Sequence, residues 1–250
     1  MAEIALVQAL AQRLINAWPS FEVEMVEGWV LRFAEGYSKR ANAATPLVPG
    51  ARLDSTLIEH IVGRFTQRGI APCVRLTGIE DTRADEVLAE GGLVSFDPSL
   101  CLIASLSSEI AADGSVLIRP EPSLSWIEAA ASAYGGDKVN AGRLGRIVRA
   151  IRHPAGFATL SMDGEEAAWG LAVAERGYVG LYDIVVAPSR RGLGLGRRLV
   201  ASLMAWGRDQ GAARAYLQMR EANTVAASLY ASLGFETAYR YTHRVLAAPG

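Results

Sequence analysis

The chain has 250 residues, of which half are apolar and a fifth are charged, and its formal net charge is −1 at pH 7. This composition is typical of a globular protein with one large or two ordinary domains, and it argues against a general binder of nucleic acid or of anionic membranes. The N-terminus lacks a basic region followed by an apolar core, and no apolar run reaches membrane-spanning length. We therefore expect a cytoplasmic protein without a membrane partner.

Cysteine and histidine are sparse. Cys73 and Cys101 both lie in apolar segments, so we expect buried free thiols in a reducing compartment. The three histidines are scattered and have no cysteine partners at metal-ligand spacing. No metal site is predicted.

Apolar spacing and turn residues predict helices and strands throughout the first half. In order, they are a helix at 4–17, a hairpin at 21–34, an extended stretch at 37–45, a helix at 53–68, a strand at 71–76, a helix at 82–90 and a strand at 100–106. Asp54 or Ser55 is the expected N-cap of the second helix, and Gly69 its end. Residues 107–115 are small and polar, which indicates a linker.

The second half predicts a similar series. In order, it consists of a strand at 116–119, helices around 125–134 and 140–151, a hairpin of strands at 157–162 and 167–174, a buried strand around 181–186, a helix at 195–208, a strand at 214–219, a helix at 224–232 and a closing strand region at 235–246. Asp163-Gly164 is the turn signal of the hairpin.

The stretch from residue 181 to residue 198, LYDIVVAPSRRGLGLGRR, predicts an anion site. It joins a β-branched strand to a helix through a turn with three alternating glycines, 192, 194 and 196. Glycines let backbone N–H groups approach a ligand, and a helix N-terminus favours negative charge. Four arginines flank the turn and indicate a phosphate-bearing ligand; they are Arg190, Arg191, Arg197 and Arg198.

The spacing of these glycines excludes two common phosphate motifs. A dinucleotide fingerprint needs G-x-G-x-x-G and a P-loop needs a lysine after the glycines, and neither is present. The pattern R-x-x-G-x-G, formed by Arg191, Gly194 and Gly196, resembles the acetyl-CoA signature of the GNAT superfamily of N-acetyltransferases. Alone it is also compatible with an ordinary strand-to-helix turn.

A second motif strengthens this resemblance. Residues 216–235, YLQMREANTVAASLYASLGF, resemble the second half of a GNAT core and are most similar to the ribosomal-protein N-terminal acetyltransferases. Together the two motifs cover about residues 116–246. The resemblance implies an acyl-CoA-dependent N-acetyltransferase that carries acetyl from acetyl-CoA to a primary amine.

The chain also resembles itself. A shift of 142 residues aligns Pro46 with Pro188 and Gly50 with Gly192, and the predicted elements recur in one order. We therefore expect an α/β (α+β) protein with two tandem GNAT-like domains, each a mixed central sheet flanked by helices. The predicted boundaries are a degenerate domain at 1–107, a linker at 108–115 and an acetyl-CoA-binding domain at 116–250. Arg52 and Asp54 stand where the second copy has glycines, and an aspartate at a helix N-terminus repels phosphate, so the first copy should not bind the cofactor.

The resemblance assigns the cofactor contacts residue by residue. They would be Ile184, Val185, Val186, Arg191, Gly192, Leu193, Gly194, Leu195, Gly196, Arg197 and Asn223. Backbone groups of the strand would pair with the pantetheine arm, and the amides of the turn would hold the pyrophosphate. Tyr230 would protonate the departing CoA thiolate as a general acid. Equally, Asn223 could be only a helix N-cap and Tyr230 a core tyrosine.

The general base is less well defined. The ribosomal-protein enzymes carry a glutamate at the position of Gln218, and glutamine does not accept a proton usefully. Asp183 is the best replacement, because burial in an apolar strand raises the pKa of a carboxyl group. It could equally be a structural acid paired with an arginine, or bulk water could deprotonate the amine.

The acceptor cannot be identified from the sequence. If the two copies pack together, the residues that would line the cleft are Trp29, Arg32, Tyr37, Arg40 and Asn42. A solvated edge strand is the alternative interpretation of that stretch. The acceptor is a small-molecule or peptide amine, and a homodimer is left open. A non-catalytic acetyl-CoA binding or sensing module is the alternative function, and an unrelated nucleotide-binding protein is a further rival.

Overall fold

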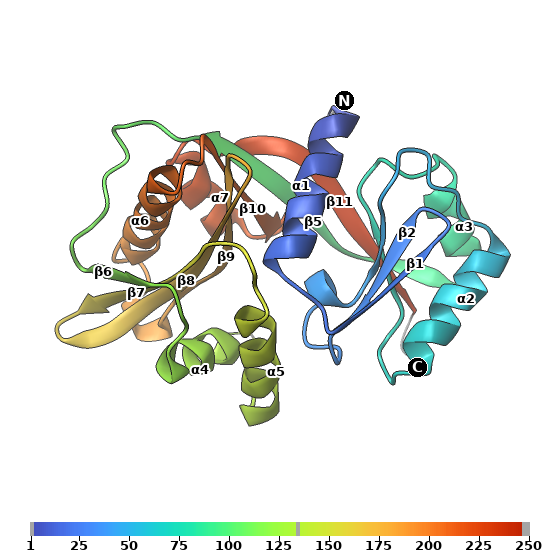
Figure 1. The fold of residues 1–250 in the computed structure, drawn as a ribbon, viewed down its shortest axis with the longest axis horizontal. Coiled ribbons are helices and arrows are strands. Elements are labelled where there is room, and N and C mark those ends of the chain that lie inside the picture. Colours follow the sequence, from blue (N-terminus) through green and yellow to red (C-terminus); the bar gives the residue numbers. More distant parts are fainter. Residues whose placement is uncertain (1–2, 134–135, 247–250) are drawn as a thin grey trace. The chain divides into compact units, whose positions relative to one another are not determined.

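The computed structural model describes residues 3–133 and 136–246, and these form two compact units (Figure 1). Within the described residues, unit 1 contains 3–101, 220–222 and 238–246, and unit 2 contains 102–133, 136–219 and 223–237. The contacts thus assign the closing strand to unit 1, whereas the predicted second domain runs to residue 250. None of the described helices is long and apolar enough to cross a membrane.

Unit 1 holds a mixed sheet with the strand order β1-β2-β3-β4-β11-β5. Its elements are α1 (Ile4–Ala17), β1 (Glu22–Val26), β2 (Trp29–Phe33), the 3₁₀ helix η1 (Lys39–Ala41), β3 (Ala44–Pro46), α2 (Ser55–Thr66), β4 (Cys73–Leu76), α3 (Ala84–Glu90), the first part of β5 (Leu93–Ser105) and most of β11 (Glu236–Leu246). Apolar residues of β2, α2, β4 and α3 form its buried core, in which the rings of Phe33 and Phe65 lie 4.8 Å apart.

In unit 2 the strands of the mixed sheet have the order β5-β10-β9-β8-β7-β6. Its elements are the end of β5, β6 (Val116–Arg119), α4 (Leu124–Ser132), α5 (Lys138–Arg149), β7 (Ala155–Met162), β8 (Glu165–Glu175), β9 (Tyr178–Val186), the 3₁₀ helix η2 (Pro188–Arg190), α6 (Leu195–Asp209), β10 (Arg214–Arg220) and α7 (Thr224–Ala231). Strands β6 to β9 are antiparallel, and β9 pairs with β10 in parallel. Figure 1 shows α6 on one face of this sheet and α4 and α5 on the other.

The predicted tandem repeat is visible in the order of elements. The series β3-α2-β4-α3-β5 of the first half matches β9-α6-β10-α7-β11 of the second, and a shift of 142 residues carries α2 into α6. The last strand of each series pairs outside its own series. Strand β11 pairs with β4 from Thr242 opposite Leu76 to Val245 opposite Cys73, and β5 neighbours β10. The two halves of the chain therefore exchange their final strands.

Two predicted elements differ from the structure. The stretch 37–45, predicted to be extended, instead forms η1 and only the start of the three-residue strand β3. The strand predicted at 100–106 is the end of the longer β5, which begins at Leu93. Asp97 lies within β5 at φ 53° and precedes a proline, and both features argue against a strand when only the local sequence is considered. The predicted end of the helix at Tyr134 lies outside the described residues.

Candidate functional site

A β-bulge interrupts strand β9 at the residue predicted to be the general base. Trp169 of β8 pairs with Val185 and Leu171 pairs with Tyr182, so Asp183 and Ile184 together lie opposite one residue. Asp183 has φ 46° and is 4% exposed. An aspartate tolerates this left-handed conformation better than most residues, and a bulge bends its strand and redirects its side chains.

Strands β9 and β10 separate next to this bulge. Their parallel pairing runs from Tyr178 opposite Arg214 to Leu181 opposite Leu217 and ends there, although β9 continues to Val186 and β10 to Arg220. Among the described residues, the edge of β9 that faces β10 therefore has no pairing with that strand beyond Leu181. Free backbone N–H and C=O groups on such an edge can pair with an extended amide-bearing ligand.

The glycine turn follows the open part of β9. Gly192 and Gly194 have φ values of 77° and 74°, and Gly194 is the N-cap of α6. The amide N–H groups of residues 192–196 have no backbone acceptor among the described residues. Unsatisfied N–H groups at a helix N-terminus are a ready site for a phosphate.

The third glycine serves helix packing. A Cβ atom on Gly196 would lie 2.9 Å from Cδ1 of Leu229, so the Leu229 side chain of α7 would have to shift to admit any other residue here. This contact holds the start of α6 beside the helix that carries Tyr230. The R-x-x-G-x-G pattern thus combines two conformational requirements with one packing requirement.

Two of the four predicted phosphate-binding arginines are held elsewhere. Arg190 forms ion pairs with Asp163 at 3.0 Å and with Glu165 at 3.3 Å. Arg198 pairs with Asp113 at 2.7 Å, and this contact, with hydrogen bonds from Ser115, lowers the pKa of the Asp113 carboxyl group. Arg190 and Arg198 therefore have carboxylate partners within the protein, and the phosphate-bearing ligand indicated by the four arginines stays a prediction.

The other two arginines remain at the turn. Arg191 and Arg197 are exposed, and Nε of Arg191 donates to the carbonyl oxygen of Val186 at 3.4 Å. Both belong to the predicted cofactor contacts. The linker, by contrast, is tied to α6, because Asp113 also donates its N–H to Oγ of Ser202 at 2.9 Å.

The predicted residues of α7 occupy its two ends. Asn223 is the N-cap, with its Oδ1 accepting from the N–H of Ala226 at 3.1 Å, and it is exposed. Tyr230 is 8% exposed, and its ring lies 5.7 Å from that of Phe235. Asn223 is thus a helix N-cap and Tyr230 a buried tyrosine, the roles given above as alternatives to their functional ones. Neither role prevents a contact with a bound cofactor.

Two tyrosines that sequence reasoning missed meet where β9 and β10 separate. The hydroxyl groups of Tyr182 and Tyr216 lie 2.7 Å apart and are buried. A Cβ atom on Gly180 would lie 2.5 Å from the Tyr182 hydroxyl, so this glycine makes room for the pair. The sequence signal that could have indicated this pair is the glycine at 180 between two tyrosines, Tyr178 and Tyr182. Gln218, two residues beyond Tyr216, has a buried Oε1 without a hydrogen-bond partner among the described residues.

The corresponding turn of unit 1 is closed by the chain itself. The carboxylate of Asp54 accepts from the N–H of Leu57 at 2.9 Å and so caps α2. The N–H of Gly50 donates to the carbonyl of Ile79 at 2.6 Å, and that of Asp81 donates to Ala51 at 3.0 Å. A carboxylate therefore stands at the N-terminus of α2, where it would repel a phosphate.

Three of the five predicted acceptor residues are interior residues of unit 1. Trp29 donates to the carbonyl of Arg52 at 2.8 Å, and Asn42 accepts from the N–H of Ala34 at 2.6 Å. Arg32 donates to the carbonyls of Arg40 and Trp18, and all three side chains are 3% exposed or less. They cannot line an open cleft in this structure, so that prediction is wrong for them. Tyr37 and Arg40 are half-buried, and the Arg40 guanidinium lies 4.7 Å from the Trp18 ring.

Solved structures share this architecture. A GCN5-related N-acetyltransferase from Kribbella flavida is similar over 98% of this chain and 96% of its own, with a TM-score of 0.68 and 18% identity. A tandem GNAT protein from the clavulanic acid biosynthesis pathway is similar over 98% of this chain and 89% of its own, with a TM-score of 0.61 and 13% identity. At these identities the likeness establishes the fold. The fold of this chain is therefore the one seen in GCN5-related and tandem GNAT proteins.

The sequence comparisons name the family. Residues 4–244 match the family model described as "Probable histone acetyltransferase Rv0428c C-terminal", and the chain belongs to this family. The "Uncharacterized N-acetyltransferase YobR" of Bacillus subtilis (strain 168) is 25% identical over 98% of this chain and 99% of its own length. The "Probable histone acetyltransferase Rv0428c" of Mycobacterium tuberculosis (strain ATCC 25618 / H37Rv) is 26% identical over 92% of this chain and 71% of its own.

Proposed function

We propose that the chain transfers an acetyl group from acetyl-CoA to a primary amine and that unit 2 carries the reaction. One observation supports this above the others: the open edge of β9 leads directly into a glycine turn with free N–H groups. The strand edge suits the amides of a pantetheine arm and the turn suits a pyrophosphate. Arg191 and Arg197 add positive charge at the turn.

The reaction needs one bond formed and one broken. The amine nitrogen attacks the thioester carbonyl, the new C–N bond forms, and the C–S bond breaks to release the CoA thiolate. Tyr230 supplies the proton that the thiolate takes up, and the amine loses its proton to Asp183 or to water. The burial of Asp183 and its position in the bulge beside the open edge support its role as base. No residue role here depends on a metal ion.

A thiol-release assay on the 250-residue chain tests the proposal. Acetyl-CoA is offered with a panel of amines that comprises a polyamine, an amino sugar, a peptide with a free N-terminus and a lysine-rich peptide. We expect release of free thiol that depends on one class of amine. Binding of acetyl-CoA without release across the panel would favour the binding or sensing module, for which the amide at Gln218 is the motivating feature. Preference for ATP or NAD over CoA in competition binding would contradict both the acetyltransferase and the acetyl-CoA binding or sensing module.

A further inference from the structure

The guanidinium group of Arg75 is buried in unit 1 without an acceptor. Arg75 lies in β4 and is 2% exposed, and its Nε and Nη2 atoms have no hydrogen-bond acceptor among the described residues. The guanidinium packs on an aromatic ring, since its Cζ atom lies 4.0 Å from the centre of the Tyr241 ring. An arginine stays charged at any pH at which the protein is folded, so its burial without an anion is costly.

The two unpaired nitrogen atoms form the edge that other arginines of this chain present to carboxylates. In Arg244, Nε donates to Oδ1 of Asp85 at 2.8 Å and Nη2 donates to Oδ2 at 2.7 Å. In Arg198 the same two atoms hold the carboxylate of Asp113, at 2.7 Å and 3.2 Å. This edge of a guanidinium matches the two oxygens of a carboxylate. In Arg75 the same edge is buried and has no such partner among the described residues.

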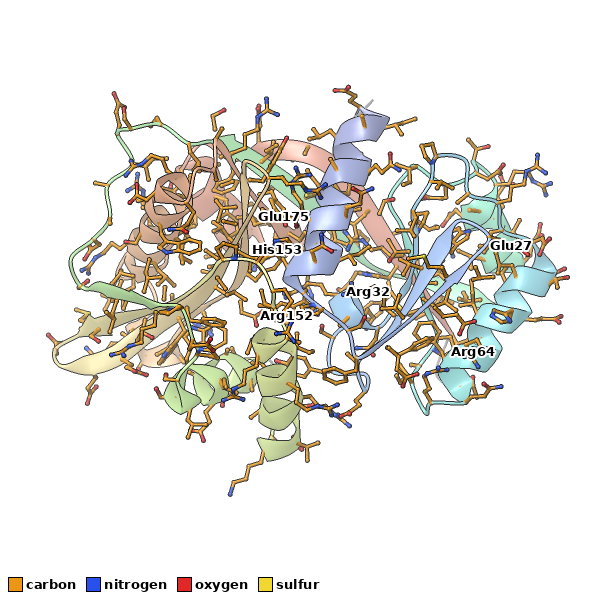
Figure 2. The ribbon with its side chains drawn as sticks, viewed as in Figure 1. Glu27, Arg32, Arg64, Arg152, His153 and Glu175 are labelled. Atoms are coloured by element: carbon orange, nitrogen blue, oxygen red, sulfur yellow. The ribbon has the colours of Figure 1, made fainter. Side chains whose placement is uncertain are left out.

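A second buried arginine of unit 1 shows how the interior satisfies a guanidinium. Arg32, which Figure 2 labels, is buried as deeply as Arg75. It donates to three backbone carbonyl oxygens, those of Ile15, Trp18 and Arg40. The fold therefore supplies acceptors to one interior arginine, whereas in the part of the chain that the structure describes it supplies none to Nε and Nη2 of the other.

The surroundings of Arg75 are positively charged and aromatic. His243 lies opposite Arg75 in the β4–β11 pair, and its ring lies 5.6 Å from that of Tyr241. Burial, and then the charges of Arg75 and Lys39, lower the pKa of the His243 ring to about 3, so this ring is neutral. Lys39 of η1 is half-buried, with Nζ 4.2 Å from the centre of the Phe96 ring. Neither cation has a carboxylate within ion-pair distance among the described residues.

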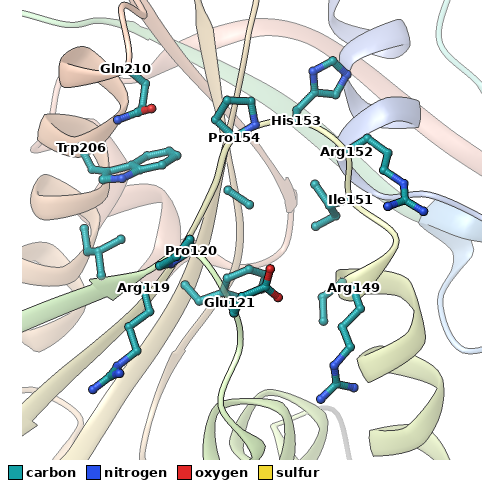
Figure 3. Close-up of a pocket in the computed structure, with 14 residues that line it drawn as sticks. Arg119, Pro120, Glu121, Arg149, Ile151, Arg152, His153, Pro154, Trp206 and Gln210 are labelled. Carbon is teal, nitrogen blue, oxygen red and sulfur yellow. The ribbon is translucent and has the colours of Figure 1, made fainter.

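A pocket of unit 2 differs from this site in the arrangement of its charges. It has a volume of about 530 Å³ and lies where β6 ends and α5 leads into β7. Figure 3 shows Arg119 and Arg149 pointing to different sides, away from the middle of the pocket, where the Glu121 carboxylate lies. All three side chains are exposed and keep their water. Arg75 is buried, so it gains far more from an anion than these arginines do.

We propose that the Nε–Nη2 edge of Arg75 binds the carboxylate group of a small organic acid. The two N–H groups donate in parallel to the two oxygens, as those of Arg244 do to Asp85. A single negative charge suits this site, because its surroundings are aromatic and a second charge would cost more to desolvate. Lys39 adds positive charge that attracts an anion. The site belongs to unit 1 and does not depend on the acetyl transfer proposed for unit 2.

Titration of the 250-residue chain with acetate tests the proposal, with proton–nitrogen correlation spectra of the arginine Nε–H groups as the readout. We expect one Nε–H signal to shift saturably with acetate but not with chloride at the same ionic strength. This signal should be absent from Arg75→Met. Without acetate, this variant should be at least as stable in urea as the wild type, because it replaces an unpaired buried charge with an apolar chain.

Arg244→Met is the matched control, since Arg244 follows His243 in β11 and already holds Asp85. It should lower the free energy of unfolding and leave the acetate-dependent signal in place. Acetate at about ten times its dissociation constant should raise the folded-to-unfolded ratio of the wild type and of Arg244→Met about elevenfold. The ratio for Arg75→Met should not change beyond the effect of chloride.

Arg75→Lys replaces the two-donor edge with a single ammonium group. It should bind acetate about tenfold more weakly than the wild type, the effect of one charged hydrogen bond. Phosphate is offered in a separate titration, and tighter binding of phosphate than of acetate would overturn the assignment to a carboxylate. Two further results would overturn the site itself: no saturable shift in the wild type, or the same acetate-dependent stabilisation in Arg75→Met.

Discussion

Leu181 and Leu217 form the last backbone pair between β9 and β10, although each strand continues for several residues beyond it. The bulge at Asp183 begins two residues later and bends β9, which accounts for the separation of the strands. A parallel pair that opens in this way exposes one strand edge in the middle of a sheet. Several predictions about individual residues depend on this opening and on the turn that follows it.

Substituting Gly196 should disturb the cofactor turn through packing. In Gly196→Val the new Cβ would meet Cδ1 of Leu229 at 2.9 Å, so the Leu229 side chain must shift and its packing between α6 and α7 is disturbed. We expect a loss of about 1–3 kcal/mol in the free energy of unfolding and weaker acetyl-CoA binding. Urea unfolding and calorimetry measure the two effects. Gly142→Ala is the control, because it lies in α5 with open space around it and should stabilise by up to about 1 kcal/mol. Equal effects of the two substitutions would contradict the packing argument.

Tyr230→Phe should separate chemistry from packing. The phenylalanine keeps the ring contact with Phe235, so the free energy of unfolding should change by less than about 1 kcal/mol. If the hydroxyl protonates the leaving thiolate, kcat should fall about a hundredfold while KM stays close to that of the wild type. Tyr241→Phe, a substitution at a similarly buried tyrosine of unit 1, should leave kcat unchanged. A Tyr230→Phe enzyme with wild-type kcat would refute the general-acid role.

Asp183→Asn should remove a carboxylate without changing the backbone. Asparagine tolerates the left-handed conformation at φ 46°, so the bulge should persist. If Asp183 is the base, kcat/KM should fall about a hundredfold and the acidic limb of its pH profile should disappear. A profile identical in shape to that of the wild type would leave water as the proton acceptor. Loss of stability without a change in that profile would identify a structural acid.

Acid should destabilise unit 1 through His243. This residue lies opposite Arg75 in the β4–β11 pair, and burial, with the charges of Arg75 and Lys39, lowers the pKa of its ring from 6.5 to about 3. The unfolded chain therefore binds a proton below pH 6.5 that the folded protein does not take up until about pH 3. The free energy of unfolding should fall by about 1.4 kcal/mol for each pH unit in this window.

Urea unfolding at about pH 7 and about pH 5.5 measures this loss, because the lower value lies one unit inside the window. His243→Phe should abolish this part of the difference, since it replaces the ring with one of similar size that does not titrate. A difference of the same size in the variant would assign the acid sensitivity to other groups.

Local patterns were sufficient to predict most elements. Helix α1 and strand β6 have the predicted bounds, and the hairpin of β7 and β8 turns at Asp163-Gly164 as expected. These elements are set by apolar periodicity and turn residues, which act over a few neighbours. The glycine turn was predicted for the same reason, since strand, turn and helix follow one another in sequence.

Features that depend on distant partners were not predicted. Arg198 pairs with Asp113, which lies 85 residues away, whereas Arg197 has no such partner in the part of the chain that the structure describes. No local pattern distinguishes the two arginines. The pairing of β11 with β4 likewise joins residues far apart in sequence. The bulge at Asp183 is set by pairing with β8, so its φ value could not be inferred from the apolar run around it.

The stoichiometry of acetyl-CoA binding tests the central claim most directly. Calorimetry on the 250-residue chain should give one acetyl-CoA per chain, and binding should be lost in Gly194→Val, because a β-branched residue disfavours φ 74°. The carboxylate of Asp54 at the start of α2 should keep the first copy empty. Two molecules bound per chain, or one that Gly194→Val binds as tightly as the wild type, would contradict the assignment of the reaction to unit 2.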